Sequence, residues 1–337
     1  MTVRSGARLP GPWRRWRTPE PAWTPAQVPD LSGRTAVITG SSRGIGAATA
    51  EHLARRGARV IIACPSSEEG RAAADAVRRR VASARTESVR CDLGHLAQVQ
   101  EAAEEITALA GRRLHLLINN AGVAALPPTV SADGFEMHFA VNHLGHFALT
   151  GRLLPALLAT PRPRVVNVSS VLHWLGRNST RPHAPRRYHR WQAYFDSKLA
   201  TLLFTQGLVT WARTHRLPLR AVSAHPGLVD TTLASHALHA GGRKAEARLL
   251  RALQAGWASP SAAAWSLVRA ATDPRVDAGE FLGPGGRWEC SGPPVRVRAA
   301  RRASDARAAQ RLWDLSQELT DRAFRPAPPA PSHRTRS

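Results

Sequence analysis

Two residues that can exchange a proton, Tyr194 and Lys198, stand four positions apart in this chain. An i, i+4 spacing brings both side chains to one face of a helix. A free tyrosine, with a pKa of about 10, is a poor base at neutral pH, but an ammonium group about 4–6 Å away favours the phenolate. Lysine and tyrosine each occur only twice in the chain, which argues against the alternative of a chance surface pair. We therefore predict that Tyr194 is a general acid/base whose pKa Lys198 tunes.

Other polar residues can complete a reaction site. Ser170 follows the apolar run 164–168, and its hydroxyl could donate a hydrogen bond to a substrate carbonyl and stabilise charge there. We expect the neighbouring Ser169 to be structural. Asn142 falls inside an expected helix, where asparagine is a poor helix former. Its side chain, or the backbone that it distorts, could hold a water that links Lys198 to solvent; a simple interhelical hydrogen bond is the alternative.

A glycine-rich turn offers a place for phosphate groups. Gly40, Gly44 and Gly46 follow an apolar strand at 34–39 and open a helix at 44–56. Without a Cβ the backbone can approach a pyrophosphate, and a helix N-terminus supplies unpaired N–H groups and a positive dipole. The strand–turn–helix context favours a dinucleotide over a plain turn. The residues expected to contact it here are Gly40, Ser42, Arg43, Gly44, Ile45 and Gly46.

The residues after the second strand bear on which dinucleotide binds. A carboxylate there would bind the ribose 2′-hydroxyl of NAD and repel the 2′-phosphate of NADP. Cys64, Pro65 and Ser66 occupy that place, and Arg43 in the glycine turn is within reach of a 2′-phosphate. These residues favour NADP, with NAD left open, because Arg43 could equally be a solvated side chain.

Strand and helix patterns alternate along the chain. Expected strands lie at 34–39, 59–63, 88–91, 114–118, 164–168 and 219–224, with a seventh near 280–282; expected helices include 44–56, 96–110, 132–159 and 191–214. Continuous apolar strands in β-α repeats predict a single α/β domain, doubly wound, with a parallel seven-stranded sheet and helices on both faces. Ligands bind beyond the carboxyl ends of such strands. The glycine turn, residues 119–122, the serines and residues 225–227 all lie at such ends.

The tails differ in composition from this domain. Residues 1–30 are rich in Pro, Trp and Arg and are expected to form a disordered or loosely docked extension; the domain spans 31–325, and 326–337 form a second tail. Trp13, Trp16 and Trp23 could pack on the domain or make peripheral contact with a membrane. No apolar run reaches about 18 residues, so no transmembrane helix is expected.

Charge and cysteine content narrow the class of protein. The formal net charge is +23, but the cations are nearly all Arg in an Ala-rich chain, which favours codon bias over a specific nucleic-acid partner. The three cysteines are far apart and show no metal spacing, which fits reduced thiols in a cytoplasmic protein without a metal site.

In combination these residues resemble the short-chain dehydrogenase/reductase superfamily, over about residues 31–325. The motifs are the glycine turn at 39–46, Asn-Asn-Ala-Gly at 119–122, Ser170, the Tyr-Phe-Asp-Ser-Lys run at 194–198 and Pro-Gly at 226–227. A closer likeness is to its retinol-dehydrogenase-like and protochlorophyllide-reductase-like branch. That likeness comes from 141–147, the long connection from Ser170 to Tyr194, 197–200, 225–227 and 311–316.

The resemblance implies a Rossmann fold, and an NAD(P)-dependent oxidoreductase that interconverts an aldehyde or ketone with an alcohol. The implied catalytic tetrad is Asn142, Ser170, Tyr194 and Lys198. The implied cofactor contacts further along the chain are Asp92 at the adenine, Asn119, Ala121 and Gly122, Tyr194 and Lys198, Pro226 and Gly227, and Val229 and Thr231 near the carboxamide. The branch usually has an Arg where Pro65 stands, which weakens the preference for NADP.

Partners and rival functions follow from the same features. Leucines at 232–255, a segment expected to cover the substrate, favour an apolar small-molecule substrate, and the family likeness implies a possible homo-oligomer. A non-catalytic dinucleotide-binding regulator is one alternative. A protein that binds membranes or polyanions through its basic tails is another.

Overall fold

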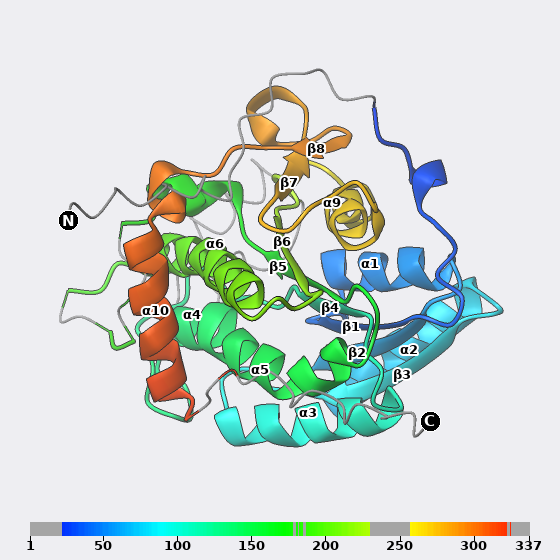
Figure 1. The fold of residues 1–337 in the computed structure, drawn as a ribbon, viewed down its shortest axis with the longest axis horizontal. Helices are drawn as coiled ribbons and strands as arrows, with labels where there is room; N and C mark the ends of the chain where they lie inside the picture. The colour runs from blue at the N-terminus through cyan, green and yellow to red at the C-terminus, as the bar shows by residue number, and fades with distance from the viewer. Residues whose placement is uncertain are drawn as a thin grey trace, which may run out of the picture.

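The computed structural model describes residues 22–177, 180, 182–184, 187–229, 257–321 and 324. At its centre is one sheet of eight strands in the order β3-β2-β1-β4-β5-β6-β7-β8 (Figure 1). The strands are β1 (Thr35–Thr39), β2 (Arg59–Cys64), β3 (Arg85–Arg90), β4 (Leu116–Asn119), β5 (Arg164–Val168), β6 (Arg220–Ala224), β7 (Phe281–Pro284) and β8 (Pro294–Arg296). The first seven are parallel, and the strand order reverses between β1 and β4. A ligand crevice is expected at such a reversal.

The eighth strand corrects the prediction of a seven-stranded parallel sheet. β8 pairs with β7 in antiparallel orientation, with Leu282 opposite Arg296. It covers three residues and begins at a proline, which has no N–H group to donate to a sheet. Such a short edge strand leaves no alternating pattern in the sequence, so periodicity could not reveal it.

Helices cover both faces of the sheet, as the β-α repeats predicted. One face carries α3 (Leu96–Leu109), α5 (Gly145–Leu158) and α6 (Arg190–Thr214); the other carries α1 (Gly44–Ala54), α2 (Ser67–Arg80) and α9 (Pro260–Thr272). Successive residues of a strand pack against opposite helix layers, because side chains point alternately to the two faces of a sheet. Val37 packs with the first layer, and Ala36 and Ile38 pack with the second. Both faces are buried in the middle of the sheet, which explains why β1, β2 and β4 are largely apolar, whereas the edge strand β3 (Arg-Thr-Glu-Ser-Val-Arg) is polar.

The helix predicted over about 132–159 is wrong in its first part. Helical structure begins with α4 (Met137–Phe139), passes through a π-helical turn (Ala140–Leu144) and continues as α5. Gly134, with a φ of +83°, forms a left-handed turn that a helix cannot contain. The Glu136 side chain then caps α4 by accepting from the N–H groups of His138 and Phe139, at 3.0 and 2.8 Å. Asn142 therefore lies in a π turn, a rare element that is frequent at functional sites.

Part of the predicted N-terminal extension packs on the domain. Trp23 and Val28 are 2% and 3% exposed, and the Trp23 ring lies 6.0 Å from that of Trp265 on α9. Trp13, Trp16 and the tail at 326–337 lie outside the described residues. The domain boundaries at 30 and 325 stay predictions, to which the structure adds a docked segment at 23–28.

The C-terminal helix α10 (Ala306–Leu319) covers α6, as Figure 1 shows. Its Trp313 fits against Gly207 of α6, where a Cβ would come within 2.7 Å of the indole ring. The same indole contacts Phe147 and Phe324 with ring centroids 5.2 and 4.6 Å away. This aromatic cluster closes the core on the α5–α6 side.

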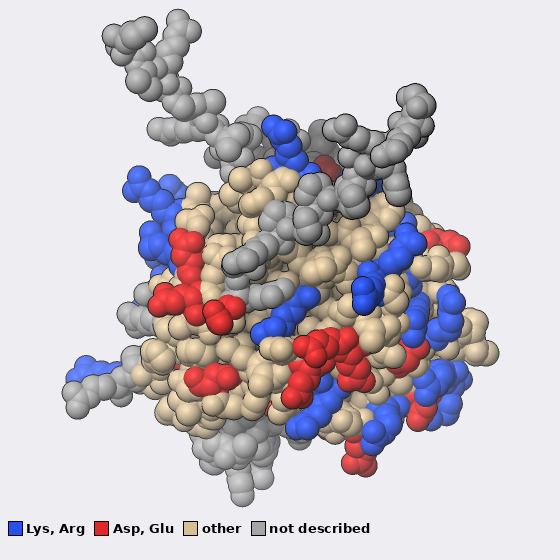
Figure 2. Space-filling model, turned by 60° about the horizontal axis from the view of Figure 1, so that its bottom comes forward, with Lys and Arg blue, Asp and Glu red and all other residues tan. Residues whose placement is uncertain are grey.

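The surface charge is mixed where it can be seen. On the face drawn in Figure 2, basic and acidic side chains are interspersed. Ion pairs such as Arg55–Glu51 and Arg59–Glu87 occur in the described structure. Among the described helices, none has the length and hydropathy to cross a lipid bilayer. The described residues also contain no cluster of three or more His, Cys, Asp or Glu side chains that could hold a metal ion.

Candidate active site

The glycine turn and the loop after β4 are in contact at the switch between β1 and β4. Gly40 has a φ of +62°, and a Cβ there would lie 2.7 Å from Cα of Ala121. A Cβ at Gly46 would lie 2.4 Å from the carbonyl oxygen of Gly40. Gly44, at the first position of α1, has a φ of +60° and open space where a Cβ would stand. This glycine cradle at a helix N-terminus fits the pyrophosphate of a dinucleotide.

Side chains of the β4 loop hold that cradle together. Asn120 Nδ2 donates to the carbonyl oxygens of Thr39 and Gly40, at 2.8 and 3.2 Å. Asn119 Nδ2 donates to Thr150 Oγ1 and Asn167 Oδ1, at 3.0 and 2.8 Å, which anchors β4 to its neighbours. The loop at 119–122, which the sequence predicts to bind a cofactor, is therefore hydrogen-bonded both to the end of β1 and to β5.

Gly122 brings the same loop beside the predicted catalytic residues. A Cβ on Gly122 would lie 3.2 Å from Asn142 Oδ1 and 3.3 Å from Lys198 Nζ. The missing side chain thus leaves room directly in front of the lysine.

Tyr194 and Lys198 lie together on α6, and Ser170 joins them from the end of β5. The Ser170 side chain lies close enough to Tyr194 to lower the pKa of its phenol, and Lys198 Nζ lies 5.9 Å from the centre of the Tyr194 ring. Lys198 Nζ donates to the carbonyl oxygen of Val168 at 3.0 Å. Ser169 Oγ donates to the carbonyl oxygen of Lys198 at 2.8 Å and so fixes α6, in line with its expected structural part. The three polar groups converge at the carboxyl edge of the sheet.

Asn142 supports this arrangement without touching either hydroxyl. Its Oδ1 accepts from the N–H of Val123 at 2.7 Å, and its Nδ2 donates to the carbonyl of Val123 and to Ser197 Oγ, both at 2.9 Å. Ser197 Oγ in turn donates to the carbonyl oxygen of Tyr194 at 2.7 Å. Asn142 therefore connects the end of the loop at 119–123 to α6. This bonding is close to the interhelical hydrogen bond that the sequence analysis gave as the alternative to a water site.

Burial moves the pKa values of the acid–base pair in opposite directions. It lowers the pKa of Lys198 to about 8. It also raises the pKa of Tyr194, against a smaller lowering effect of Ser170. The expected lowering of the Tyr194 pKa is thus absent, because desolvation outweighs the effect of Ser170 and the Lys198 ammonium donates to the carbonyl oxygen of Val168 instead. The phenol is protonated at neutral pH.

The turn after β6 is braced by the segment before β8. Gly227 has a φ of +82°, and a Cβ there would lie 2.3 Å from the carbonyl oxygen of Cys290. His225 Nε2 lies 3.0 Å from Glu289 Oε2. Pro226 and Val229 belong to the same turn, and Val229 is buried. Thr231 and the segment 232–255 lie outside the described residues.

Asp92, the predicted adenine contact, follows β3, and its Oδ1 accepts from the N–H of Gly94 at 2.9 Å. The carboxylate of Glu69, which was not predicted from the sequence, also lies at the glycine turn. Glu69 Oε2 accepts from Ser42 Oγ at 3.1 Å, and Ser66 caps α2 by accepting from the N–H of Glu69 at 3.2 Å. The signal was present as a Ser-x-x-Glu capping pattern at 66–69.

A second group that the sequence analysis missed lies beside Tyr194. Glu136 Oε1 accepts from Tyr188 OH at 2.8 Å and contacts His138 Nδ1 at 2.7 Å. The ring of His138 lies edge-on to that of Tyr194, with centroids 6.3 Å apart. This cluster fastens the segment before α6 to α4, and nothing in sequence spacing connects residues about 50 positions apart.

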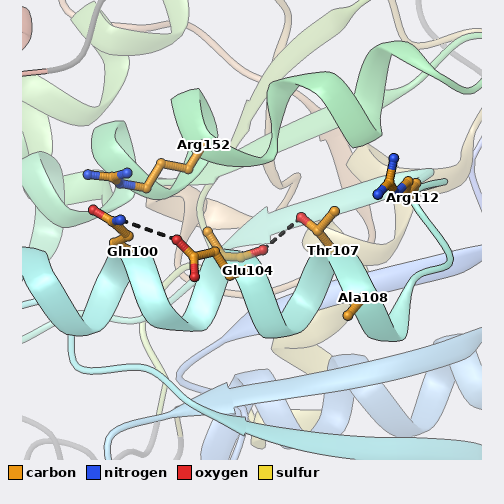
Figure 3. Close-up of a pocket in the computed structure, with 7 residues that line it drawn as sticks. Gln100, Glu104, Thr107, Ala108, Arg112 and Arg152 are labelled. Atoms are coloured by element: carbon orange, nitrogen blue, oxygen red, sulfur yellow. Dashed lines mark hydrogen bonds between the residues drawn. The ribbon is translucent and has the colours of Figure 1, made fainter.

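A separate pocket of about 400 Å³ lies between α3 and α5 (Figure 3). It is lined by Gln100, Ala103, Glu104, Thr107, Ala108, Arg112 and Arg152. Gln100 Nε2 donates to Glu104 Oε1 at 3.2 Å, and the Thr107 hydroxyl bonds the helix backbone. None of the predicted site residues lines it, so it is not part of the candidate active site.

The sequence is similar to those of known proteins. The family model described as short chain dehydrogenase matches residues 34–240. Polyprenol dehydrogenase of Mus musculus is 37% identical over 309 residues, which cover 88% of this chain and 86% of that protein. Retinol dehydrogenase 12 of Mus musculus is 37% identical over 303 residues, with 88% of each chain covered.

Solved structures give the same assignment. A protein from Mycobacterium paratuberculosis is 39% identical with a TM-score of 0.72, over 90% of this chain and 100% of that one. A metagenomic short-chain oxidoreductase in complex with NADP is 26% identical (TM-score 0.51; 71% and 91% covered). A Burkholderia phymatum relative in complex with NAD is 25% identical (TM-score 0.57; 72% and 86% covered). The chain therefore belongs to the short-chain dehydrogenase/reductase family, in its retinol-dehydrogenase-like branch.

Proposed function

We propose that Ser170, Tyr194 and Lys198 carry out the interconversion of an apolar aldehyde or ketone with its alcohol. The family membership makes the protein an NAD(P)-dependent oxidoreductase of apolar substrates. The observation that carries the residue assignment is the proximity of two buried side chains on α6: Lys198 Nζ lies 5.9 Å from the centre of the Tyr194 ring. The buried Ser170 at the end of β5 acts on the same phenol and lowers its pKa. A regulator without catalysis is not favoured, because the acid–base groups are intact and the relatives are dehydrogenases.

Bound NAD(P)H would supply a hydride at the carbonyl carbon. Ser170 and Tyr194 would donate hydrogen bonds to the carbonyl oxygen, which orients the substrate and stabilises the charge that develops there. Because burial raises the pKa of Tyr194, its phenol carries the proton at neutral pH and can act as the general acid. Lys198, charged below its pKa of about 8, then stabilises the phenolate that remains.

The cofactor contacts remain proposals that the glycine cradle supports. The turn at 40–46 and the N-terminus of α1 would hold the pyrophosphate. The loop at 119–122, with Asn119, Ala121 and Gly122, would pass beside the nicotinamide ribose, and Asp92 would lie at the adenine. Pro226, Gly227, Val229 and Thr231 would lie near the carboxamide. Asn142 would hold Val123 and Ser197 in place; the water relay from Lys198 stays a prediction.

For the choice of dinucleotide we propose NADP, with a preference that Glu69 limits. Arg43 in the glycine turn can pair with a 2′-phosphate, as the sequence analysis expected. The Glu69 carboxylate, bonded to Ser42 of the same turn, repels a phosphate in that region. We therefore expect use of both dinucleotides, with a modest preference for NADP.

Location and partners are proposals of the same kind. Reduced cysteines favour the cytoplasm, and the described structure has Cys64, Cys91 and Cys290 as free thiols. A homo-oligomer and peripheral membrane contact through residues 1–30 remain proposals from the family likeness and from the composition.

The test of the reaction is reduction of a panel of apolar aldehydes and ketones with NADPH and NADH. Tyr194→Phe removes the proton donor and keeps the ring, so kcat should fall about 10²–10⁴-fold. Binding of the dinucleotide, measured by fluorescence, should stay within about threefold of the wild type. Unchanged turnover in Tyr194→Phe would refute the assignment of the general acid.

A further inference from the structure

His146 stands between the cofactor loops and the helix that carries the acid–base pair. It is the second residue of α5, directly after the π turn, and is 3% exposed. Its Nε2 lies 2.8 Å from Thr39 Oγ1, and its Nδ1 lies 3.3 Å from the carbonyl oxygen of Asn142. Thr39 directly precedes the glycine turn, and Asn142 bonds Ser197 of α6, the helix that carries Tyr194 and Lys198.

The partners of His146 define which ring nitrogen carries the proton. A carbonyl oxygen only accepts, so Nδ1 must be the donor to Asn142. Nε2 is then the acceptor, and the Thr39 hydroxyl donates to it. Thr39 Oγ1 also accepts from the N–H groups of Asn120 and Ala121 at 2.9 and 3.0 Å. The other acceptor within reach of its proton, the carbonyl oxygen of Ile118, lies at 3.5 Å, so the shorter contact of 2.8 Å with His146 Nε2 takes the proton.

One directional chain of hydrogen bonds results. It runs from the backbone of 120–121 through Thr39 and His146 to the carbonyl of Asn142. The hydroxyl of Thr201 on α6 meets the same carbonyl at 3.4 Å. The amide of Asn142 continues through Ser197 to the backbone of Tyr194.

We propose that His146 is a positioning residue. It holds the two loops expected to bind the dinucleotide, at 40–46 and 119–122, in a fixed position relative to α6, which carries Tyr194. This inference rests on the proposed function, because it assumes that the nicotinamide binds beside the loop at 119–122. The Thr39 bond fixes the loops to the helical segment that carries His146, and the Asn142 bond fixes the orientation of the imidazole ring on that segment. Asn142 in turn bonds Ser197 and Thr201 of α6. Both bonds are needed for efficient turnover, but they contribute to different steps.

The charge state of the His146 imidazole is consistent with a positioning role. Burial lowers the pKa of His146 to about 3, and the nearby Lys198 ammonium acts in the same direction. The ring therefore stays neutral over the physiological range, and the donor and acceptor ends of the link keep their places.

Two near-isosteric substitutions separate the two bonds. His146→Asn places an amide N–H where Nδ1 stands, so it can keep the Asn142 bond and loses the Thr39 bond. His146→Gln places an amide oxygen where Nε2 stands, so it can keep the Thr39 bond and loses the Asn142 bond. We expect His146→Gln to bind the dinucleotide within about threefold of the wild type, with kcat reduced about 10-fold. We expect His146→Asn to show the reverse, with the dinucleotide Kd raised about 10-fold and kcat at saturation nearly unchanged.

His143→Leu is the matched control. His143 is equally buried, 1% exposed, but its Nε2 contacts Ser316 of α10 at 2.7 Å, away from the cofactor loops. It should lower thermal stability about as much as His146→Leu, while kcat and the dinucleotide Kd stay within about twofold. Thr39→Ser keeps the hydroxyl and should behave like the wild type, whereas Thr39→Val should reproduce the effect of His146→Asn.

A spectroscopic measurement tests the link without any turnover. In ¹⁵N-histidine NMR spectra, the resonance that His146→Gln removes should show the neutral Nδ1–H tautomer from pH 5 to pH 9. Titration of that ring near pH 6, or the Nε2–H tautomer, would overturn the proposal. So would equal kinetic changes in His146→Asn and His146→Gln. If instead the wild type fails to turn over while the tautomer is as stated, the proposed function fails and the link stands.

Discussion

Replacing Lys198 by methionine should stabilise the protein without its cofactor. Lys198 is 5% exposed and carries a charge at neutral pH, with one hydrogen bond from Nζ to the carbonyl of Val168. Burial lowers its pKa from 10.5 to about 8, which means that the folded protein binds this proton less tightly than the unfolded chain does. The ammonium group therefore lowers the free energy of unfolding.

The size of the effect follows from the difference between the two pKa values. A difference of 2.5 pH units corresponds to about 3 kcal/mol at any pH below about 8. Methionine removes this penalty but leaves the Val168 carbonyl without its donor, which costs about 1 kcal/mol. We expect Lys198→Met to raise the free energy of unfolding by about 2 kcal/mol at pH 7, or to raise Tm by roughly 4 °C.

The pH dependence gives the sign. As pH rises from 8 to 10.5 the unfolded chain still holds the proton that the folded protein has lost, so the stability of the wild type rises and the advantage of Lys198→Met shrinks. Urea unfolding at pH 6, 7, 8, 9 and 10 measures both chains. Arg311→Met, which removes one charge from an exposed position, is the control and should change little at any pH. Equal stability of the wild type and Lys198→Met at pH 7, or a difference independent of pH, would refute the reasoning.

Three further outcomes are expected. Glu69→Gln should raise the ratio of kcat/KM for NADPH to that for NADH about 5–10-fold, since it removes a carboxylate beside the glycine turn; an unchanged ratio would place Glu69 away from the 2′-position. Gly122→Ala should raise the dinucleotide Kd at least about 10-fold in fluorescence titrations, because the added Cβ would lie 3.3 Å from Lys198 Nζ; wild-type affinity would mean that the dinucleotide does not pass there. Carbonyl reduction should be constant below pH 8 and decline above it as Lys198 loses its proton; a steady-state pH profile that is flat to pH 10 would contradict the assigned part of the lysine.

The features predicted from sequence share a local cause. β1 and the glycine turn could be predicted because the end of the strand, the glycines that let the backbone approach a ligand and the start of the helix fall within about twelve consecutive residues. Tyr194 and Lys198 could be placed on one face because both belong to one helix, and the structure has that helix at Arg190–Thr214. β5 was predicted to the residue, since its buried valines, Val165, Val166 and Val168, fall within five consecutive residues.

The features that sequence did not show depend on contacts across the fold. The π turn at Ala140–Leu144 has an ordinary helical composition, and what distinguishes it is the bonding of Asn142 to Val123 and Ser197. Glu69 lies near Ser42 only because α2 starts beside the glycine turn. The raised pKa of Tyr194 is a matter of burial depth, which spacing along a helix cannot report.

The opposite pKa changes of Tyr194 and Lys198 have one physical cause and one chemical consequence. In water the two groups have nearly equal pKa values, 10.0 and 10.5. Burial disfavours the phenolate and the ammonium alike, so it separates them: the lysine becomes the stronger acid, with a pKa of about 8. In the proposed reaction Tyr194 gives its proton to a substrate oxygen, and a proton transfer back to it from the Lys198 side would then run in the favourable direction. In the proposed mechanism, the desolvation that destabilises the fold at Lys198 therefore also sets the order of the two proton transfers, and a more exposed pair would lose that order.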